Sequence, residues 1–346
     1  MQQSQAKIAE ALDELRHSAA HLTSDPHLLE RLVAVHDIVG DDLVWVDEAL
    51  ESLSAEGLRP ATDAAQHLVK RGGKRVRPQA VLLAAACFGP VPPAARTIAL
   101  VSELIHSATL LHDDVTDDGR ERRGVPAARL VYGNAVSVLS GDLLLVHALE
   151  RTWSDVPELM NDLLITLRDL VDGEVLQLRG RSKLDVSEAT YDRILRGKTA
   201  SLFAWSTRSG ARVAGAGPEA LSAAARFGEL MGIAFQLVDD VLDYTGSDTG
   251  KGSLVDLREG KVTLPLVLAA QGNPKLFDTL RRIHGGDLDA VPAAARMVIE
   301  SGACLQVRER ALAVTDRAIE TLTSLPVSPA RRLLEDVARE LARRAA

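Results

Sequence analysis

The stretch of residues 104–124, LIHSATLLHDDVTDDGRERRG, joins an apolar run to a cluster of carboxylates and then to a pair of arginines. Residues three and four apart lie on one face of a helix, so a helix here places Asp113, Asp114 and Asp117 close together. Carboxylates this close repel one another unless a cation lies between them. Mg²⁺ suits such a cluster, because it binds one or two carboxylates and completes its shell with waters and substrate phosphates. A single cluster of this kind also occurs at solvated helix ends, so the stretch needs further support.

The same spacing returns in residues 235–243, FQLVDDVLD, at Asp239, Asp240 and Asp243. This second copy lies inside an apolar run, and acids on so apolar a helix are costly to bury without a counter-charge. Two copies on facing helices could hold metal ions and a polyphosphate between them. The repeat therefore favours a metal-dependent phosphate site over a solvated helix end.

Basic residues of the kind that bind phosphate stand at a few other points of the chain. Residues 72–78 read GGKRVRP and supply Lys74 and Arg77. Arginine binds phosphate bidentately, whereas lysine acts as a mobile point charge. The other candidates are Arg122, Arg123, Lys198, Lys251 and Lys261.

The composition of the 346-residue chain indicates helices rather than a sheet. The chain is 46% apolar but only 3% aromatic, whereas sheets favour β-branched and aromatic side chains. A net charge of −8 without a basic stripe argues against nucleic acid as a partner. The two cysteines, Cys87 and Cys304, show no metal-ligand spacing and fit a reducing compartment. With no apolar run of the length that spans a bilayer and no signal peptide, we expect a cytoplasmic protein.

Hydrophobic residues recur with helical spacing through most of the chain. This periodicity predicts helices over residues 43–53, 60–70, 79–88, 92–117, 136–151, 160–178, 187–210 and 221–244, with further amphipathic helices over 263–345. No long alternation typical of a strand occurs. Helices joined by short turns predict an all-α bundle of about ten or more helices.

Taken together, the motifs resemble those of the trans-polyprenyl diphosphate synthases. The resemblance rests on GGKRVRP at 72–78, the block at 106–124, KTA at 198–200, FQLVDDVLDYTG at 235–246 and DLREGKVTLP at 256–265, in the family's order over roughly residues 45–270. It implies a single catalytic domain of the isoprenoid synthase type over residues 41–346, with helices around a central substrate cavity. Residues 1–40 would then form an N-terminal helical extension. It also implies a homodimer.

The resemblance implies a Mg²⁺-dependent head-to-tail (1′-4) condensation of isopentenyl diphosphate onto an allylic diphosphate. The allylic substrate would be dimethylallyl, geranyl, farnesyl or geranylgeranyl diphosphate, and the products an all-trans polyprenyl diphosphate and pyrophosphate. Some two or three Mg²⁺ ions would act as Lewis acids on the leaving group. The protein would neutralise charge, position the alkene and exclude water.

The resemblance also assigns roles to individual residues. The metal ligands would be Asp113, Asp117 and Asp239, with Asp114, Asp240 and Asp243 as partial ligands or holders of metal-bound water. The allylic diphosphate would be contacted by Arg122, Lys198 and Lys251. The isopentenyl diphosphate would be bound by Gly73, Lys74, Arg77, His106 and Arg123. Thr199 and Gln236 would lie near the reacting carbons. Lys261 could bind phosphate or cap a helix, and His106 would also fit an ordinary core histidine.

One departure from the family pattern follows Lys251. The family commonly has a proline there and a glycine shortly before the aspartate, whereas this chain has Gly252 and Leu254 before Asp256. The loop is therefore more flexible at one point and bulkier at another. This difference affects how the loop closes around Lys251.

The residues before the first aspartate motif predict the length of the product. A tail anchored at Asp113 runs back along its helix, and one helical turn rises about 5.4 Å, close to the length of an isoprene unit. Short-chain relatives block the first turn with Phe or Tyr, whereas this chain has Ala108 and Thr109. Ile105 and Ser102, further back, provide no aromatic plug either.

The floor of the tail site must then come from a neighbouring helix, and Leu144 and His147 are candidates. At one isoprene unit per turn, we expect a medium- or long-chain product of about C30 or longer, of the quinone side-chain type.

Three other functions share parts of this pattern. A short-chain synthase, which makes farnesyl or geranylgeranyl diphosphate, would carry the same motifs. A terpene cyclase usually has one aspartate-rich motif and an Asn/Ser/Glu triad, so the second copy and the isopentenyl site argue against it. A regulatory subunit of a heteromeric synthase would tend to lose the aspartates, and none is missing here.

Substituting Ala108→Phe should shorten the product to about C15–C20, because the ring fills the first helical turn behind Asp113. The first condensation should remain intact. Chromatography of the product alcohols measures the effect. An unchanged product from the variant, or a parent enzyme that stops at C15 or C20, would contradict the expectation.

Overall fold

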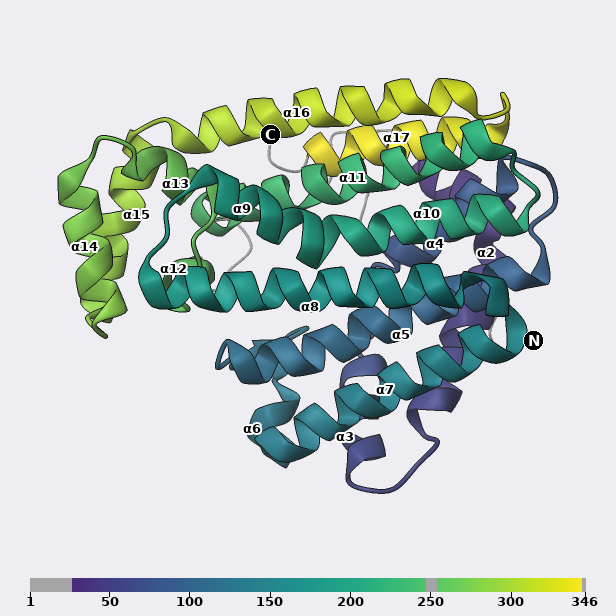
Figure 1. The fold of residues 1–346 in the computed structure, drawn as a ribbon, viewed down its shortest axis with the longest axis horizontal. Coiled ribbons are helices and arrows are strands. Elements are labelled where there is room, and N and C mark those ends of the chain that lie inside the picture. Colours follow the sequence, from purple (N-terminus) through teal and green to yellow (C-terminus); the bar gives the residue numbers. More distant parts are fainter. Residues whose placement is uncertain (1–26, 247–253, 344–346) are drawn as a thin grey trace.

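The computed structural model describes residues 27–246 and 254–343. Within these ranges the chain is a bundle of helices, and its only sheet is a short antiparallel hairpin of two-residue strands (Figure 1). The first elements are α2 (His27–Ser54), α3 (Ala61–Val69), α4 (Val76–Ala86), α5 (Pro93–Thr116), β1 (Glu121–Arg122), β2 (Val125–Pro126), α6 (Ala128–Tyr132), α7 (Asn134–Asp155), η1 (Pro157–Leu159) and α8 (Met160–Lys183). The prediction of an all-α fold is confirmed.

The second part of the chain continues in the same manner. Its elements are α9 (Glu188–Leu195), η2 (Arg196–Ala200), α10 (Ser201–Val213), α11 (Pro218–Thr245), α12 (Val255–Arg258), α13 (Leu264–Ala270), α14 (Pro274–His284), η4 (Leu288–Ala290), α15 (Val291–Glu300), α16 (Ala303–Thr321), η5 (Leu322–Ser324) and α17 (Pro329–Arg343). In Figure 1 the long helices follow one another from α16 and α17 at the upper edge through α11, α10 and α8 to α5 and α7.

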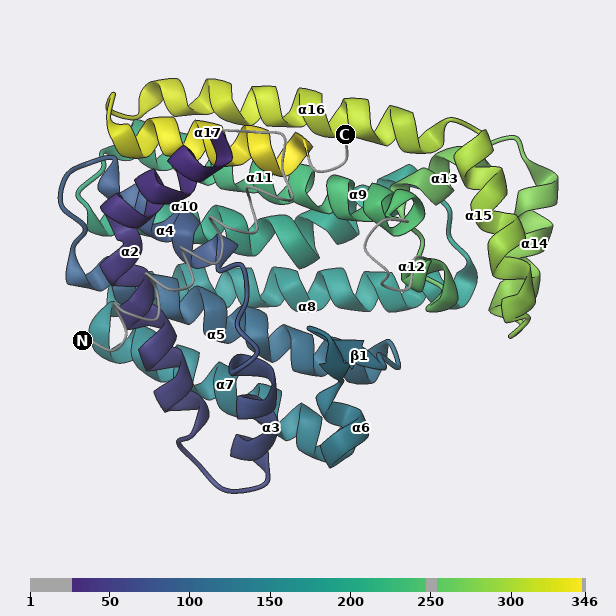
Figure 2. The same ribbon diagram turned by 180° about the vertical axis from the view of Figure 1, so that it is seen from behind.

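Most predicted helices end within a few residues of the observed ones, which is the usual uncertainty of helix ends. Two regions differ. The helix predicted over residues 187–210 is three consecutive segments, because η2 between α9 and α10 is a π-helical turn. The helix predicted over residues 43–53 is the end of α2, which runs from residue 27 to residue 54 and crosses the back of the bundle (Figure 2). It passes without a break through residue 40, so the division into an extension and a catalytic domain stays a prediction.

α5 lies at the centre of the larger core. Its apolar side chains recur every three or four residues, and Ile98, Val101, Leu104 and Leu111 are fully buried against α2, α4, α7 and α10. This packing fixes the direction in which the last turn of α5 points. The aspartates that follow the apolar stripe are therefore held rigidly at the end of a buried helix.

α11 belongs to both hydrophobic cores. Phe227 and Leu230 pack into the core around α5, whereas Leu237 and Val241 pack into a second core with α13, α15 and α16. α11 is also long and apolar enough to cross a membrane by length and composition, and 56% of its most apolar stretch is buried inside the bundle. A central helix of a bundle meets the same criteria, so its apolar character follows from its two packed faces.

Candidate active site

A cavity of about 700 Å³ lies among α5, α8, α9, η2 and α11. The predicted site residues that line it are Gly73, Lys74, Arg77, His106, Thr109, Asp113, Asp117, Arg122, Arg123, Lys198, Thr199, Gln236, Asp239, Asp240 and Lys261. Among the predicted residues that the structure describes, Ala108, Asp114 and Asp243 do not line it. Lys251 lies outside the described residues. Segments far apart in the sequence thus meet in one place.

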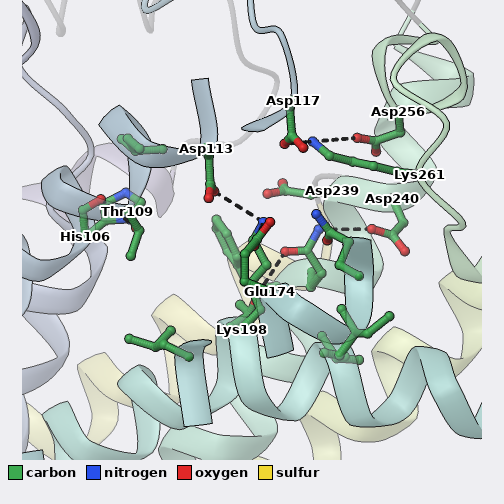
Figure 3. A pocket seen from close by; sticks show the side chains of 18 of the residues that line it. His106, Thr109, Asp113, Asp117, Glu174, Lys198, Asp239, Asp240, Asp256 and Lys261 are labelled. Atoms are coloured by element: carbon green, nitrogen blue, oxygen red, sulfur yellow. Dashed lines mark hydrogen bonds and ion pairs between the residues drawn. The ribbon is translucent and has the colours of Figure 1, made fainter. Parts of the chain in front are cut away.

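The two aspartate motifs face each other across this cavity. The last turn of α5 directs Asp113 and Asp117 toward Asp239 on α11 (Figure 3). Asp113 and Asp117 share a face because four residues make about one helical turn. The arrangement matches the clamp expected from the repeated spacing, and the metal-binding role of these residues stays a prediction.

Three basic side chains accompany the carboxylates of the first motif. Lys198 Nζ lies 3.3 Å from Asp113 Oδ2. Lys261 Nζ lies 2.8 Å from Asp117 Oδ2, and Arg181 Nη1 lies 3.2 Å from Asp117 Oδ1. Opposite charges at such distances stabilise one another in a buried site. Arg181, on α8, was not identified from the sequence, because it reads as one of several charges at a helix end.

Glu174 on α8 completes this group, and no motif in the sequence points to it. Its Oε2 lies 2.5 Å from Lys198 Nζ. Burial lowers the pKa of Lys198, but Asp113 and Glu174 outweigh burial and raise that pKa above its ordinary value. Burial in turn raises the pKa of Glu174, against the effect of Lys198.

On the α8 side of the cavity wall, two polar atoms have no partner among the described residues. Glu174 Oε1 and Gln177 Nε2 are buried without a hydrogen bond, and both residues line the cavity. A buried polar group without a partner costs about 1–3 kcal/mol. These atoms are therefore suited to a polar ligand inside the cavity.

Close contact between α8 and η2 places Lys198 beside Glu174. A Cβ on Gly173 would lie 2.6 Å from the backbone nitrogen of Lys198, and a Cβ on Gly197 would lie 2.7 Å from the backbone oxygen of Asp169. Only glycine fits at such distances. The π-helical turn itself carries Lys198, in keeping with the frequent occurrence of π-turns at functional sites.

The middle aspartate of the first motif faces the protein rather than the cavity. Asp114 is buried, and its Oδ1 accepts hydrogen bonds from Arg122 Nε at 2.9 Å and Nη2 at 2.6 Å. A carboxylate bound in this way fixes both the position and the charge of the guanidinium. Asp114 thereby holds Arg122 at the cavity wall.

Asp240, the middle aspartate of the second motif, is also buried and fully engaged. Its Oδ2 accepts hydrogen bonds from Tyr191 Oη at 2.7 Å and from the backbone N–H of Leu264 at 3.2 Å. Its Oδ1 accepts one from Gln236 Nε2 at 3.0 Å. Burial, with a contribution from Asp256, raises the pKa of Asp240 to about 7. Tyr191 is a further lining residue that the sequence did not identify.

Asp243, the third aspartate of that motif, ties α11 to the start of α12. Its carboxylate accepts the N–H groups of Val255 at 2.9 Å and Asp256 at 3.2 Å, and its backbone oxygen accepts that of Leu254. Its role as a metal ligand stays a prediction. Leu254 has a left-handed φ of 73°, a conformation that suits glycine, which explains the glycine that the family commonly has there.

The other end of the cavity is basic, and Arg75 there pairs with the buried Glu103 and the half-exposed Asp47. Arg75 Nε lies 2.6 Å from Asp47 Oδ1, and its Nη1 lies 2.6 Å from Glu103 Oε1. Arg123 Nη1 donates to the backbone oxygen of Leu68 at 3.1 Å. Glu103 is almost wholly buried. Each partner of Arg75 stands 28 residues away in the sequence, so no local motif reveals the pairs.

Arg77 and His106 face the same end. The Arg77 guanidinium lies over the Phe203 ring at 4.6 Å, and its Nε is buried without a partner among the described residues. Burial lowers the pKa of Arg77 to about 10, so it is cationic at neutral pH. Burial and the neighbouring arginines, Arg77 first, lower the pKa of His106 well below 6.5, so His106 is neutral. This end therefore suits an anion.

The donor set of the cavity fits magnesium. Within residues 27–246 and 254–343, no three His, Cys, Asp or Glu side chains converge closely enough to hold a metal by themselves. Mg²⁺ typically takes one or two carboxylates and completes its shell with waters and substrate phosphates. The oxygens of Asp113, Asp117 and Asp239 are donors of this type.

Comparisons with known proteins agree with this geometry. A family model described as polyprenyl synthetase matches residues 59–299. The chain belongs to the polyprenyl synthetase family. It is therefore a prenyltransferase, and its helical bundle is the isoprenoid synthase fold.

Individual relatives match almost the whole chain. Heptaprenyl diphosphate synthase component 2 of Geobacillus stearothermophilus is 37% identical over 322 residues, which cover 91% of this chain and 99% of that protein. Octaprenyl diphosphate synthase of Escherichia coli is 36% identical over 313 residues, which cover 88% of this chain and 96% of that protein. The crystal structure of a polyprenyl synthase from Caulobacter crescentus, complexed with calcium and isoprenyl diphosphate, superposes with a TM-score of 0.84 at 35% identity and covers 90% of this chain and 98% of that one.

Replacing Glu103 by alanine should lower the free energy of unfolding by about 3–5 kcal/mol, because it removes a buried partner of Arg75. As a matched control, Glu188→Ala breaks the exposed pair with Arg310 and should cost at most about 1 kcal/mol. Urea unfolding measures both losses. Equal losses in the two variants would show that the Arg75 pair does not behave as a buried ion pair.

Proposed function

We propose that this chain joins isopentenyl diphosphate head-to-tail (1′-4) to an allylic diphosphate, building an all-trans polyprenyl diphosphate of medium or long length and releasing pyrophosphate. The observation that carries this proposal is the opposition of Asp113 and Asp117 to Asp239 in a cavity with a separate basic end. Two diphosphates can bind at distinct ends of such a cavity. The names of the heptaprenyl and octaprenyl synthases among the relatives support the same reaction.

The aspartate end holds the allylic diphosphate. Mg²⁺ ions, held by Asp113, Asp117 and Asp239, supply Lewis acidity to the leaving group when they are bound. The divalent calcium in the Caulobacter structure supports a cation-dependent site. Lys198 and Arg122 add fixed positive charges, because carboxylates hold both side chains in place. Charges placed before the reaction stabilise the departing pyrophosphate without reorganisation.

The basic end holds isopentenyl diphosphate. Lys74, Arg77 and Arg123 line it, and the Nε of Arg77, which has no partner in the described part of the chain, offers a donor. The neutral imidazole of His106 can donate one further hydrogen bond. Binding the two diphosphates at opposite ends holds the alkene and the allylic carbon near each other, which converts a bimolecular reaction into an effectively unimolecular one.

The walls behind Asp113 bear on the length of the product. Thr109 lines the cavity, whereas Ala108 is buried beneath its surface. Leu144 and His147 are buried in α7 and do not line the cavity, so neither forms its floor in this conformation. Thr109→Phe is therefore a useful companion to Ala108→Phe, since its ring would enter the cavity directly. The short-chain alternative has less support, because the curated relatives named above make longer products.

Asp113→Ala and Asp239→Ala should each lower kcat by about 10²–10³, as expected for a preorganised electrostatic contact. The assay uses the purified chain alone with isopentenyl and allylic diphosphates and Mg²⁺, followed by product analysis. Asp118→Asn is the matched control, because Asp118 is exposed and pairs with Arg129 outside the cavity. A cyclised product would favour a terpene cyclase, and inactivity without a second protein would favour a subunit of a heteromeric enzyme. Near-parental turnover of either alanine variant would rule out the two-motif clamp.

We also propose a homodimer. The apolar helices predicted over residues 92–117 and 136–151 are the first candidates for its interface. The first of these, α5, is largely buried, whereas α7 and α8 carry many exposed apolar side chains. These side chains are Val138, Leu139, Val146, Trp153, Leu164, Ile165, Val171, Val175 and Leu178. Exposed apolar patches of this extent mark interaction surfaces.

We further propose a cytoplasmic location. The two free, buried cysteines support it, because disulfides are rare in reducing compartments.

The chain should sediment as a dimer at micromolar concentration, and Val146→Glu should shift it toward the monomer, since burying an unpaired charge is costly. Val327→Glu is the control, because Val327 is 85% exposed and lies outside α7 and α8. Sedimentation velocity distinguishes the species. A monomeric parent, or equal behaviour of the two variants, would remove this interface.

A further inference from the structure

A chain of hydrogen bonds runs along the cavity wall from α9 to η2. Tyr191 Oη donates to Asp240 Oδ2 at 2.7 Å, and Gln236 Nε2 donates to Asp240 Oδ1 at 3.0 Å. Thr199 Oγ1 donates to Gln236 Oε1 at 3.1 Å. All four side chains line the cavity. These hydrogen bonds therefore connect the buried Tyr191 to the hydroxyl of Thr199, the residue after Lys198.

The Asp240 carboxylate determines which group donates and which accepts in each of these hydrogen bonds. Asp240 accepts at both oxygens, from Tyr191 and Leu264 at Oδ2 and from Gln236 at Oδ1, so the Gln236 amide turns its NH₂ group toward Asp240. Its carbonyl oxygen then faces Thr199 and accepts the hydroxyl hydrogen. Tyr191 and the backbone N–H of Leu264 occupy the other carboxylate oxygen, which keeps the carboxylate from rotating. The hydroxyl hydrogen of Thr199 is therefore held by Gln236 Oε1, and the lone pairs of the Thr199 oxygen remain available to a ligand.

A lone pair and a hydroxyl hydrogen have opposite effects on a nearby cation. Ionisation of an allylic diphosphate leaves positive charge on the allylic carbons, and an oxygen lone pair stabilises that charge, whereas a hydroxyl hydrogen destabilises it. A dipole that is oriented before the reaction has no reorganisation cost at the transition state. The orientation of Thr199 is therefore important for the rate.

We propose that Tyr191 is a positioning residue, which acts through Asp240 and Gln236 to turn the lone pairs of Thr199 toward the allylic cation. This inference rests on the proposed function. It gives Asp240 a role as the orienting acceptor of the chain, distinct from metal binding by its neighbour. Tyr191 itself does not touch the reacting atoms, so its effect is on kcat and not on the binding of either diphosphate.

Tyr191→Phe tests the proposal, because it removes the hydroxyl and keeps the ring. A lost hydrogen bond to a charged group corresponds to a fall in kcat of about ten-fold or more. The KM values for both diphosphates should stay within about two-fold, since a group that acts only in the transition state changes kcat alone. Tyr244→Phe is the matched control: Tyr244 is equally buried, but its hydroxyl pairs with Thr263 at 3.3 Å and it does not line the cavity.

A double-mutant cycle with Thr199 separates positioning from a general structural effect. In a Thr199→Val background, Tyr191→Phe should have little further effect, because the end of the chain is missing. In a Thr199→Ser background, which keeps the hydroxyl, the effect of Tyr191→Phe should return. Additive losses in the Thr199→Val background would overturn the proposal.

Calorimetric binding gives a second readout that does not depend on turnover. The probes are an allylic diphosphate analogue with a trialkylammonium nitrogen at the cationic carbon and its neutral isostere. Tyr191→Phe should weaken the ammonium probe about ten-fold and leave the neutral one unchanged, whereas equal affinities for the ammonium probe would overturn the proposal. A parent enzyme that forms no polyprenyl diphosphate would overturn the proposed function and this inference together. An active parent with an unaffected Tyr191→Phe variant would overturn this inference alone.

Discussion

Carboxylates that face one another inside a protein must be neutralised, and this constraint determines much of the arrangement around the cavity. The first motif draws its counter-charges from three separate segments: Lys198 from η2, Arg181 from α8 and Lys261 from the turn before α13. Each cation is only partly exposed, so the adjacent carboxylate stabilises its charge. The ion pairs therefore connect α5 to helices that do not follow it in the sequence. The same side chains line the cavity.

Because of helical geometry, the aspartates within one motif contact different surroundings. Successive residues of a helix point about 100° apart, so Asp114 cannot face the same way as Asp113. Asp113, Asp117 and Asp239 line the cavity, whereas Asp114 faces the protein and holds Arg122. Asp240 also lines the cavity, but its oxygens are taken by Tyr191, Gln236 and the backbone N–H of Leu264. A doubled aspartate thus supplies one carboxylate that is open to the cavity and one that holds neighbouring side chains of the protein.

The sequence predicted the features that depend on local spacing and left out those that depend on distant pairing. The 3.6-residue period of apolar residues and the repeated aspartates led to the helical fold and to the facing of Asp113 and Asp239. Glu174 was missed because a single acid on an amphipathic helix looks like a solvated side chain until Lys198 packs against it. The buried pair of Glu103 and Arg75 joins two segments that no motif connects. The π-turn at η2 was missed because one extra residue in a helical turn leaves no mark in the hydrophobic pattern.

The glycine contacts between α8 and η2 also limit how the size of this cavity can change. Gly173 and Gly197 bring two backbones together so closely that neither helix can move nearer, and a side chain at either position would force them apart. The distance between these two walls of the cavity is therefore a fixed dimension. Room for a longer or shorter hydrocarbon must come from exchanging side chains on α5 and α8, as at Thr109 or Leu170, which both line the cavity. The space available to the hydrocarbon therefore changes when lining side chains are substituted, whereas the distance between α8 and η2 stays the same.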